Sequence, residues 1–407
     1  MGYTKEAIRG ISWMAALRAS SRFLTLVRVP ILARLLTPAQ HGTVGVAMIM
    51  LSFVEILTET GINTFLIQEN TKIEKYMSTA WVVSIARGFL ISLFIIIGAP
   101  FVASFFNSPD SYPLLLLVSI VPILRGFINP VVVQFQKELR FDREFQFRFW
   151  IFLIDSLVAI VLAFLTRSAA SIVWGFIFGA SLELALSFIL VKPTPRFAFE
   201  ATMLKKILHR GKWITAIGIL DYAFRHGDDI VVGKMLPISS LGFYQNAYKI
   251  SELPLTEVAV VASKVTFPVF TKISGDTKRL RRAFFRTIFG IAIVVIPIGV
   301  MLFLFPREII LLILGHQWVD ATTALQALAL FGVLRAIIGS VNVFFLASRK
   351  QEYVTLVTAI STAGLFITIV PFVSLFGIVG AGVAATVGLF CSLPFVFYFT
   401  LKLLRRA

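Results

Sequence analysis

Residues 77–105 read MSTAWVVSIARGFLISLFIIIGAPFVASF, and this stretch decides the fold class. It contains one charged residue, Arg87, among side chains that are almost all apolar or small. A bilayer core of about 30 Å needs about 20 helical residues to cross it, and a long run with so few charges is typical of a transmembrane helix. The stretch therefore predicts a membrane-spanning segment.

Similar runs recur along the chain. We predict further transmembrane helices near residues 11–33, 43–67, 112–135, 147–166, 169–191, 208–233, 241–269, 284–305, 319–346, 352–374 and 377–401. The composition agrees, because 58% of the residues are hydrophobic and 14% are charged, whereas an ordinary soluble domain is about half apolar and about a quarter charged. The sequence thus predicts an all-α integral membrane protein with about 12 transmembrane helices.

The basic residues are distributed unevenly between the loops. Of the 38 Lys and Arg residues, 25 fall at the termini and in the even-numbered gaps between predicted helices, whereas the odd-numbered gaps hold only Arg34, Arg167, Lys234 and Arg307. Basic residues mark the cytoplasmic side of a membrane. We therefore predict that both termini are cytoplasmic, and we attribute the net charge of +17 to topology rather than to nucleic-acid binding.

Residues for other chemistries are scarce. Cys391 is the only cysteine, so no disulfide is expected. The four histidines are scattered and show no metal-ligand spacing. We expect no catalytic residue, no metal site and no cofactor.

Two short patterns occur twice. Residues 34–38 (RLLTP) precede Gly42 as residues 234–237 (KMLP) precede Gly242, and 123–128 (ILRGFI) resembles 333–338 (VLRAII). These matches predict two six-helix halves, residues 1–200 and 201–407, that enter the membrane in the same direction. Parallel repeats occur in transporters, which hold their substrate path between the halves. The duplication favours a carrier over a channel.

Several charged residues lie inside the predicted helices. A charge at a lipid-facing helix centre costs roughly 2.5–3.5 kcal/mol, so such a residue is expected to face a watery cavity or a partner. These charges concentrate in the first, second, seventh and eighth helices, which we predict to line a cavity. The basic members are Arg18, Arg22, Arg28, Arg225 and Lys249, and the acidic members are Glu55, Glu59, Asp221 and Asp228.

The basic set predicts an anion site. A guanidinium group is a planar fork that donates two hydrogen bonds to a phosphate at once, so we expect a substrate with a phosphate or pyrophosphate. The alternative for the acidic set is that it only neutralises the arginines in structural ion pairs. Arg125 and Arg335, which match in the repeat, suit a structural role near the inner ends of their helices.

Two segments carry a family resemblance. Residues 33–42 (ARLLTPAQHG) resemble the opening signature of the polysaccharide transporter family, the O-antigen and exopolysaccharide repeat-unit flippases. Residues 228–236 (DDIVVGKML) look like a second pattern of that family. The family lies in the superfamily that also holds multidrug exporters and lipid-linked peptidoglycan-precursor flippases.

The resemblance implies two six-helix lobes in a V shape around a central cavity. It implies a flippase that moves an isoprenoid-pyrophosphate-linked oligosaccharide from the inner to the outer leaflet of a prokaryotic cell membrane by alternating access. Arg18, Arg22 and Arg225 match the cationic cavity residues of such flippases by location. Many relatives couple to a proton or sodium gradient, for which the four acids named above are the candidates. A polysaccharide polymerase or glycosyltransferases are the other partners that this reading leaves open.

Three other functions compete with this interpretation. A multidrug exporter of the same fold, coupled to a proton or sodium gradient, tends to need acids in its cavity, and the arginine excess weighs against it. A membrane glycosyltransferase or polymerase usually has a sizeable extramembrane loop, whereas the odd-numbered gaps here are all short. A channel is disfavoured by the duplicated halves. We therefore expect a transporter and not an enzyme.

Overall fold

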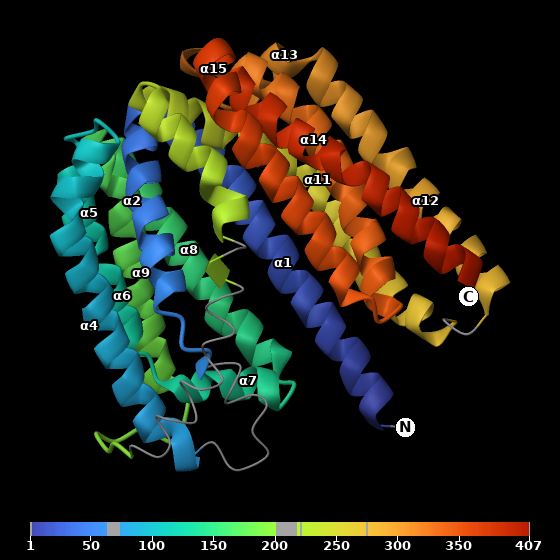
Figure 1. Cartoon of the computed structure of the whole chain (residues 1–407). Coiled ribbons are helices and arrows are strands. Elements are labelled where there is room, and N and C mark those ends of the chain that lie inside the picture. The colour runs from blue at the N-terminus through green and yellow to red at the C-terminus, as the bar shows by residue number, and fades with distance from the viewer. Residues whose placement is uncertain (1, 63–73, 201–217, 220–221, 274–275, 407) are drawn as a thin grey trace. The chain divides into compact units, whose positions relative to one another are not determined.

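A computed structural model describes residues 2–62, 74–200, 218–219, 222–273 and 276–406 of the chain. The chain divides into two compact units, Met1–Ala223 (unit 1) and Phe224–Ala407 (unit 2). Every regular element in the described ranges is a helix (Figure 1). The prediction of an all-α chain is therefore confirmed, while the predicted boundary between residues 200 and 201 stays a prediction.

Unit 1 is built from helices that pack in neighbouring pairs. α1 packs against α8, α8 against α9, and α4 against α6 (Figure 1). Apolar side chains of α2, α4, α5 and α9, among them Leu51, Ile95, Leu115 and Ile177, form a buried cluster. The elements are α1 (Gly2–Leu35), α2 (Pro38–Leu57), α4 (Glu74–Phe105), α5 (Ser111–Val118), α6 (Ile120–Gly126), η1 (Pro130–Val133), α7 (Gln134–Lys137), α8 (Phe141–Thr166) and α9 (Ala170–Ile189).

The start of α2 is encoded in the local sequence. The backbone N–H of Gln40 donates to Thr37 Oγ1 at 3.3 Å, and the backbone N–H of Thr37 donates to Gln40 Oε1 at 2.9 Å. This reciprocal pair is a capping box, and Pro38 suits the first helical position because an N–H there has no partner within the helix. The stretch 33–42 is thus the junction between α1 and α2.

The prediction of one continuous helix over 112–135 is wrong. The chain bends by 73° between the α5–α6 segment and the η1–α7 segment. Pro130 disfavours a helical conformation at the residue before it. The Asn129 side chain accepts a hydrogen bond from the backbone N–H of Val131 at 3.0 Å, which starts η1 in a new direction. The apolar length of the segment was visible in the sequence, but the bend was not predicted.

α4 and α6 approach each other through two glycines. A β-carbon at Gly88 would lie 2.4 Å from a carbonyl oxygen of α6, and one at Gly126 would lie 2.8 Å from a carbonyl oxygen of α4. Small residues allow transmembrane helices to pack backbone against backbone in this way. Because Arg87 and Arg125 directly precede the two glycines, this contact also sets the positions of both arginines.

Hydrogen bonds between helix ends and connecting segments define two ends of unit 1. Gln40 Nε2 donates to the carbonyl oxygen of Arg167 at 2.7 Å, which joins the α1–α2 junction to the α8–α9 junction. At the other end, the backbone N–H of Arg196, beyond α9, donates to Ser78 Oγ near the start of α4 at 3.3 Å. Arg34, in the last turn of α1, and Arg167, just after α8, therefore lie at one end of unit 1, and the segment that carries Arg196 lies at the other.

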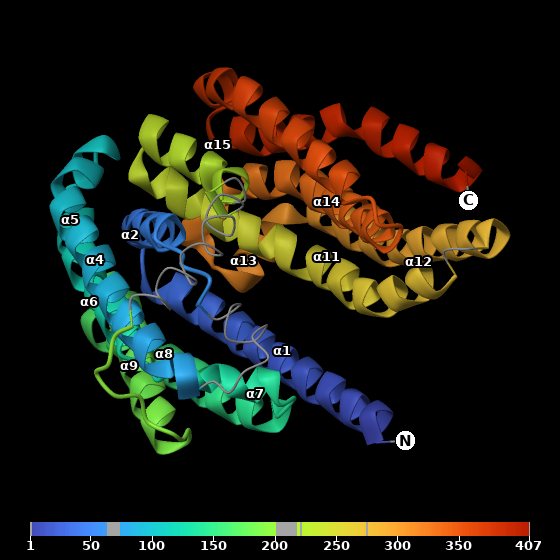
Figure 2. The same cartoon turned by 60° about the horizontal axis from the view of Figure 1, so that its bottom comes forward.

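Unit 2 is organised around α14. This helix packs against α11, α12 and α15 (Figure 2). The predicted helices 352–374 and 377–401 are the two parts of α15, which bends at Gly377, where φ is 59° and ψ is −135°. A helical run at residues 222–235 leads into α11 (Ile238–Lys272), α12 (Thr277–Leu304), α13 (Pro306–Ile313), η2 (His316–Ala321), α14 (Thr322–Ala347) and α15 (Gln351–Arg406).

The surfaces of both units are suited to lipid. Large apolar side chains stand outward in each, for example Phe101, which is 73% exposed, and Ile367, which is 75% exposed. Among the described residues, eight helices are long and apolar enough to cross a membrane, or nine if the bent segment counts as one span. α1 is not among these helices. The 54-residue helix Gln351–Leu404 is counted as one span. The chain is thus a multi-pass membrane protein, and the number twelve stays a prediction.

Candidate functional site

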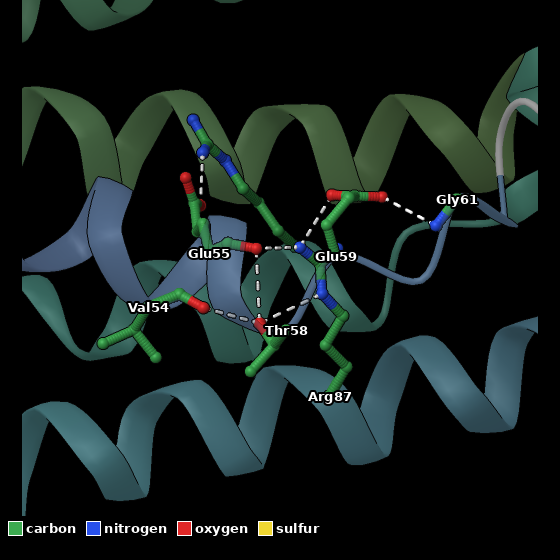
Figure 3. Close-up of polar contacts among 7 residues, drawn as sticks. Val54, Glu55, Thr58, Glu59, Gly61 and Arg87 are labelled. Carbon is green, nitrogen blue, oxygen red and sulfur yellow. Dashed lines mark hydrogen bonds and ion pairs between the residues drawn. The ribbon is translucent and has the colours of Figure 1, made fainter. Parts of the chain in front are cut away.

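A charged cluster lies where α2 ends (Figure 3). Arg87 Nη2, on α4, donates to the carbonyl oxygen of Glu55 at 2.7 Å and to Glu59 Oε2 at 2.9 Å. Its Nε lies 3.4 Å from Thr58 Oγ1. The last carbonyl groups of a helix lack an intrahelical donor, and a basic side chain there satisfies them and complements the helix dipole. Arg87 therefore caps α2.

The prediction that the second helix extends over 43–67 is wrong, because α2 ends at Leu57. Beyond it, Glu59 Oε1 accepts a hydrogen bond from the backbone N–H of Gly61 at 2.9 Å (Figure 3). Gly61 has a φ of 65°, a conformation that glycine adopts most readily. Residues 63–67 of the predicted helix lie outside the described ranges.

Arg125 on α6 forms an ion pair with Glu55 on α2. The distance from Arg125 Nη1 to Glu55 Oε1 is 3.2 Å, and the two side chains are 46% and 31% exposed. Glu55 and Glu59, predicted as ion-coupling or ion-pair acids, thus each contact an arginine of a neighbouring helix. A role for them in coupling stays a prediction.

Unit 2 contains a similar ion pair. Arg335 Nη1 on α14 lies 3.2 Å from Glu252 Oε1 on α11, with side-chain exposures of 17% and 27%. The same guanidinium donates to the Tyr248 hydroxyl. It also lies over the rings of Phe224 and Phe331, at 5.7 and 5.5 Å from their centroids, which is cation–π geometry. Arg335 therefore joins three helical segments of unit 2.

Asp228 is buried in unit 2 and is held by two donors. The Tyr244 hydroxyl donates to its Oδ2 at 2.7 Å, and the backbone N–H of Asp229 donates to its Oδ1 at 3.0 Å. Asp228 is 4% exposed, so this carboxyl group is buried, and its two donors come from α11 and from its own helical run. Asp221, the other acid predicted on that run, lies outside the described residues.

Arg28 in the first helix has an acidic partner on α8. Its Nη1 lies 2.7 Å from Asp155 Oδ2, the side chains are 15% and 11% exposed, and the guanidinium carbon lies 5.3 Å from the centroid of the Phe176 ring. Arg18 and Arg22 are half-buried. At 3.6 residues per turn, they leave the axis of α1 in directions that differ from that of Arg28 by about 80–120°. The three arginines therefore do not share one environment.

Arg225 and Lys249, the predicted basic residues of unit 2, are both exposed within the described part of the chain. The structure thus places the predicted basic residues in α1 of unit 1 and in the 222–235 run and α11 of unit 2. Their meeting around a common cavity stays a prediction.

Sequence reasoning missed a second group of charges in unit 1. Glu144 and Arg148 on α8 and Glu183 on α9 line a cavity of about 460 Å³. The spacing of Glu144 and Arg148, four residues apart on one helix, was a signal that could have found the first two. Glu183 is far from them in sequence and is brought near by the packing of α9 against α8.

A sequence profile of the family described as "Polysaccharide biosynthesis protein" matches residues 31–323. The match begins just before the α1–α2 junction and reaches α14 in unit 2, so it includes both units.

Individual proteins are similar to the chain over most of its length. The lipopolysaccharide biosynthesis protein WzxC of Escherichia coli strain K12 is 22% identical, over 86% of this chain and 72% of that protein. The succinoglycan biosynthesis transport protein ExoT of Rhizobium meliloti strain 1021 is 23% identical, over 80% of this chain and 66% of that protein. The solved structure of the lipid II flippase MurJ in an inward closed conformation has a TM-score of 0.77 at 17% identity, covering 97% of this chain and 89% of that one. The last likeness establishes the fold.

Proposed function

Because the chain belongs to the polysaccharide biosynthesis protein family, we propose that it is a flippase that moves an isoprenoid-pyrophosphate-linked oligosaccharide repeat unit from the cytoplasmic to the outer leaflet. The observation that carries this proposal is the family match over residues 31–323, in a chain whose described residues hold eight or nine candidate spans. The names of WzxC and ExoT refer to polysaccharide synthesis and transport. The structure of MurJ, a lipid II flippase, has the same fold as this chain. The chain is a transporter and not an enzyme.

The headgroup of this substrate fits the basic residues. A pyrophosphate is recognised well by guanidinium groups, which donate paired hydrogen bonds. Arg18, Arg22 and Arg225 are the residues proposed to bind it, with Lys249 beside them. Arg28 is already paired with Asp155, so its proposed contribution is to hold α1 against α8 near the headgroup.

Transport is proposed to proceed by alternating access between two six-helix lobes, residues 1–200 and 201–407, arranged as a V with twelve spans. The paired contacts Arg125–Glu55 and Arg335–Glu252 support this internal repeat, because each joins an arginine of the duplicated pattern to a glutamate of an earlier span of the same unit. The basic loops support cytoplasmic termini in a prokaryotic inner membrane.

The coupling acid is proposed to be among Glu55, Glu59, Asp221 and Asp228. Asp228 is favoured because it is buried and held by a hydroxyl and a backbone N–H rather than by an arginine side chain. Polymerases or glycosyltransferases as partners remain a hypothesis. A multidrug exporter of the same fold is the second candidate, and it is disfavoured because the family and the relatives named above are polysaccharide proteins.

The proposal is tested by the leaflet distribution of lipid-linked oligosaccharide in cells depleted of the protein. We expect accumulation on the cytoplasmic leaflet that the wild type relieves. Arg18→Ala, Arg22→Ala and Arg225→Ala are each expected to lower export by roughly fivefold or more at unchanged membrane abundance, because each removes charge-assisted hydrogen bonds.

Arg282→Ala, which removes an exposed arginine of α12, is the control and is expected to export normally. Normal export by all three cavity variants would refute the anion-binding role. Depletion without accumulation, but with altered drug sensitivity, would instead support the multidrug exporter.

A further inference from the structure

A cavity of about 460 Å³ lies inside unit 1, against the break between α6 and η1. Broken transmembrane helices are tolerated where their backbone lines a cavity, and transporters often bind ions or substrates at such places. The charged side chains that line this cavity are Glu55, Arg87, Arg125, Glu144, Arg148 and Glu183. They come from five helices, so the site depends on the packing of the whole unit.

On one side of the cavity each arginine has its own carboxylate. Arg125 Nη1 lies 3.2 Å from Glu55 Oε1, and Arg87 Nη2 lies 2.9 Å from Glu59 Oε2. Charge is balanced there.

On the other side two acids share Arg148. Its Nε lies 4.0 Å from Glu144 Oε1, and its Nη1 lies 3.9 Å from Glu183 Oε1. A charge-assisted hydrogen bond is about 2.7–2.9 Å long, so both contacts are too long to be direct hydrogen bonds. Two carboxylates opposite one guanidinium leave one negative charge in excess.

Glu144 has an oxygen that lacks a partner. The residue is 5% exposed, and its Oε1 accepts a hydrogen bond from Gln136 Nε2 at 2.6 Å. Its Oε2 is buried and has no hydrogen-bond partner among the residues that the structure describes. A buried carboxylate oxygen without a partner is strongly unfavourable, so the site lacks a positively charged or proton-bearing group.

We propose that Glu144 Oε2, together with Glu183, binds one small monovalent cation, a proton or an alkali ion, that enters through this cavity. A single positive charge neutralises the excess and supplies the missing partner of Oε2. An anion is disfavoured, because Arg87 and Arg125 are already paired and Arg148 is flanked by two carboxylates. The charge balance lies within unit 1 and is independent of the cargo, so the inference goes beyond the proposed function.

The test uses the purified full chain in lipid nanodiscs and two probes. Binding of radioactive sodium is measured at alkaline pH, and the infrared carbonyl band of a protonated carboxyl group is measured at acidic pH. We expect the wild type to show at least one of these signals. Glu144→Gln is expected to weaken sodium binding by roughly tenfold or more, or to remove the band, because it replaces the charged ligand with an amide of the same shape.

Glu138→Gln is the matched control, since Glu138 is exposed, lies just before α8 and does not line the cavity. It is expected to keep the wild-type signals. Absence of both signals in the wild type, equal signals in wild type and Glu144→Gln, or equal losses in both variants would overturn the proposal. If Glu144→Gln does not fold, Glu183→Gln takes its place, and unchanged signals in that variant also overturn it. Neither probe requires transport, so a failure here is distinct from a failure of the flippase function.

Discussion

Two ion pairs, Arg125–Glu55 in unit 1 and Arg335–Glu252 in unit 2, have the same geometry in different surroundings. Each joins Nη1 to Oε1 at 3.2 Å, and each arginine lies in the pattern that occurs twice in the sequence. The exposure of the arginine side chain separates them, at 46% for Arg125 and 17% for Arg335.

The difference in exposure changes what the same contact contributes. Arg335 lies over two aromatic rings and also binds Tyr248, so removing its acid leaves a largely buried charge without its carboxylate. Arg125 is 46% exposed and lines the cavity of unit 1, where solvent exposure and four charged groups besides Glu55 screen the pair. We infer that the Arg335–Glu252 pair stabilises the packing of the helices in unit 2. The Arg125–Glu55 pair in unit 1 mainly balances charge at the cavity.

The largest expected effect is that of Glu252→Ala. Loss of this acid leaves Arg335 without its carboxylate, and we expect the free energy of unfolding to fall by about 3 kcal/mol. The thermal midpoint of the purified protein in detergent, followed by tryptophan fluorescence, measures this change. Glu308→Ala, which removes an exposed acid of the same unit, is the control. Equal midpoints for the two variants would contradict the role assigned to the unit 2 pair.

An intermediate effect is expected for Arg87→Ala. This change removes donors from the Glu55 carbonyl oxygen and the Glu59 carboxylate at the end of α2, and it should cost about 1–3 kcal/mol. The same thermal assay applies, with the exposed Arg143→Ala as control. A wild-type midpoint would show that Arg87 does not stabilise the end of α2.

The smallest effect is expected for Glu55→Ala, which should change stability by less than about 1 kcal/mol, because its pair with Arg125 is partly solvated. Double-mutant cycles sharpen the comparison directly. The coupling energy between Arg335 and Glu252 should exceed that between Arg125 and Glu55. Similar coupling energies in the two units would mean that exposure does not distinguish the pairs.

The sequence predicted the helices better than their interruptions. The helix predicted over 77–105 differs from α4 only at its first residues, because apolar length is a property of the local chain. The helix predicted over 112–135 contains a 73° bend, although its apolar character was recognised correctly. Hydropathy averages over a window, and it does not register the single Asn129 side chain that starts η1.

The charged residues show the same limit for the site. The sequence marks Arg28 as an unusual charge in a span, but it does not point to Asp155 as its partner. The sequence also singles out Glu55 and Glu59 and leaves pairing with arginines open, but it does not point to Arg87 as a partner. Glu144 is not among the predicted site residues, because it lies at the start of α8 and looks like an ordinary helix-end residue.

By itself, the sequence determined the apolar spans, the alternation of basic loops and the capping box at Thr37, since each depends on residues that are neighbours in the chain. Tertiary structure alone decided which charges meet. Arg28 and Asp155 are 127 residues apart and Arg125 and Glu55 are 70 apart, yet each pair is in contact. A charge inside a membrane helix needs a partner, but its own sequence does not say which helix supplies one. That choice follows from close contacts such as Gly88 against α6, where the packing of two backbones brings distant side chains together.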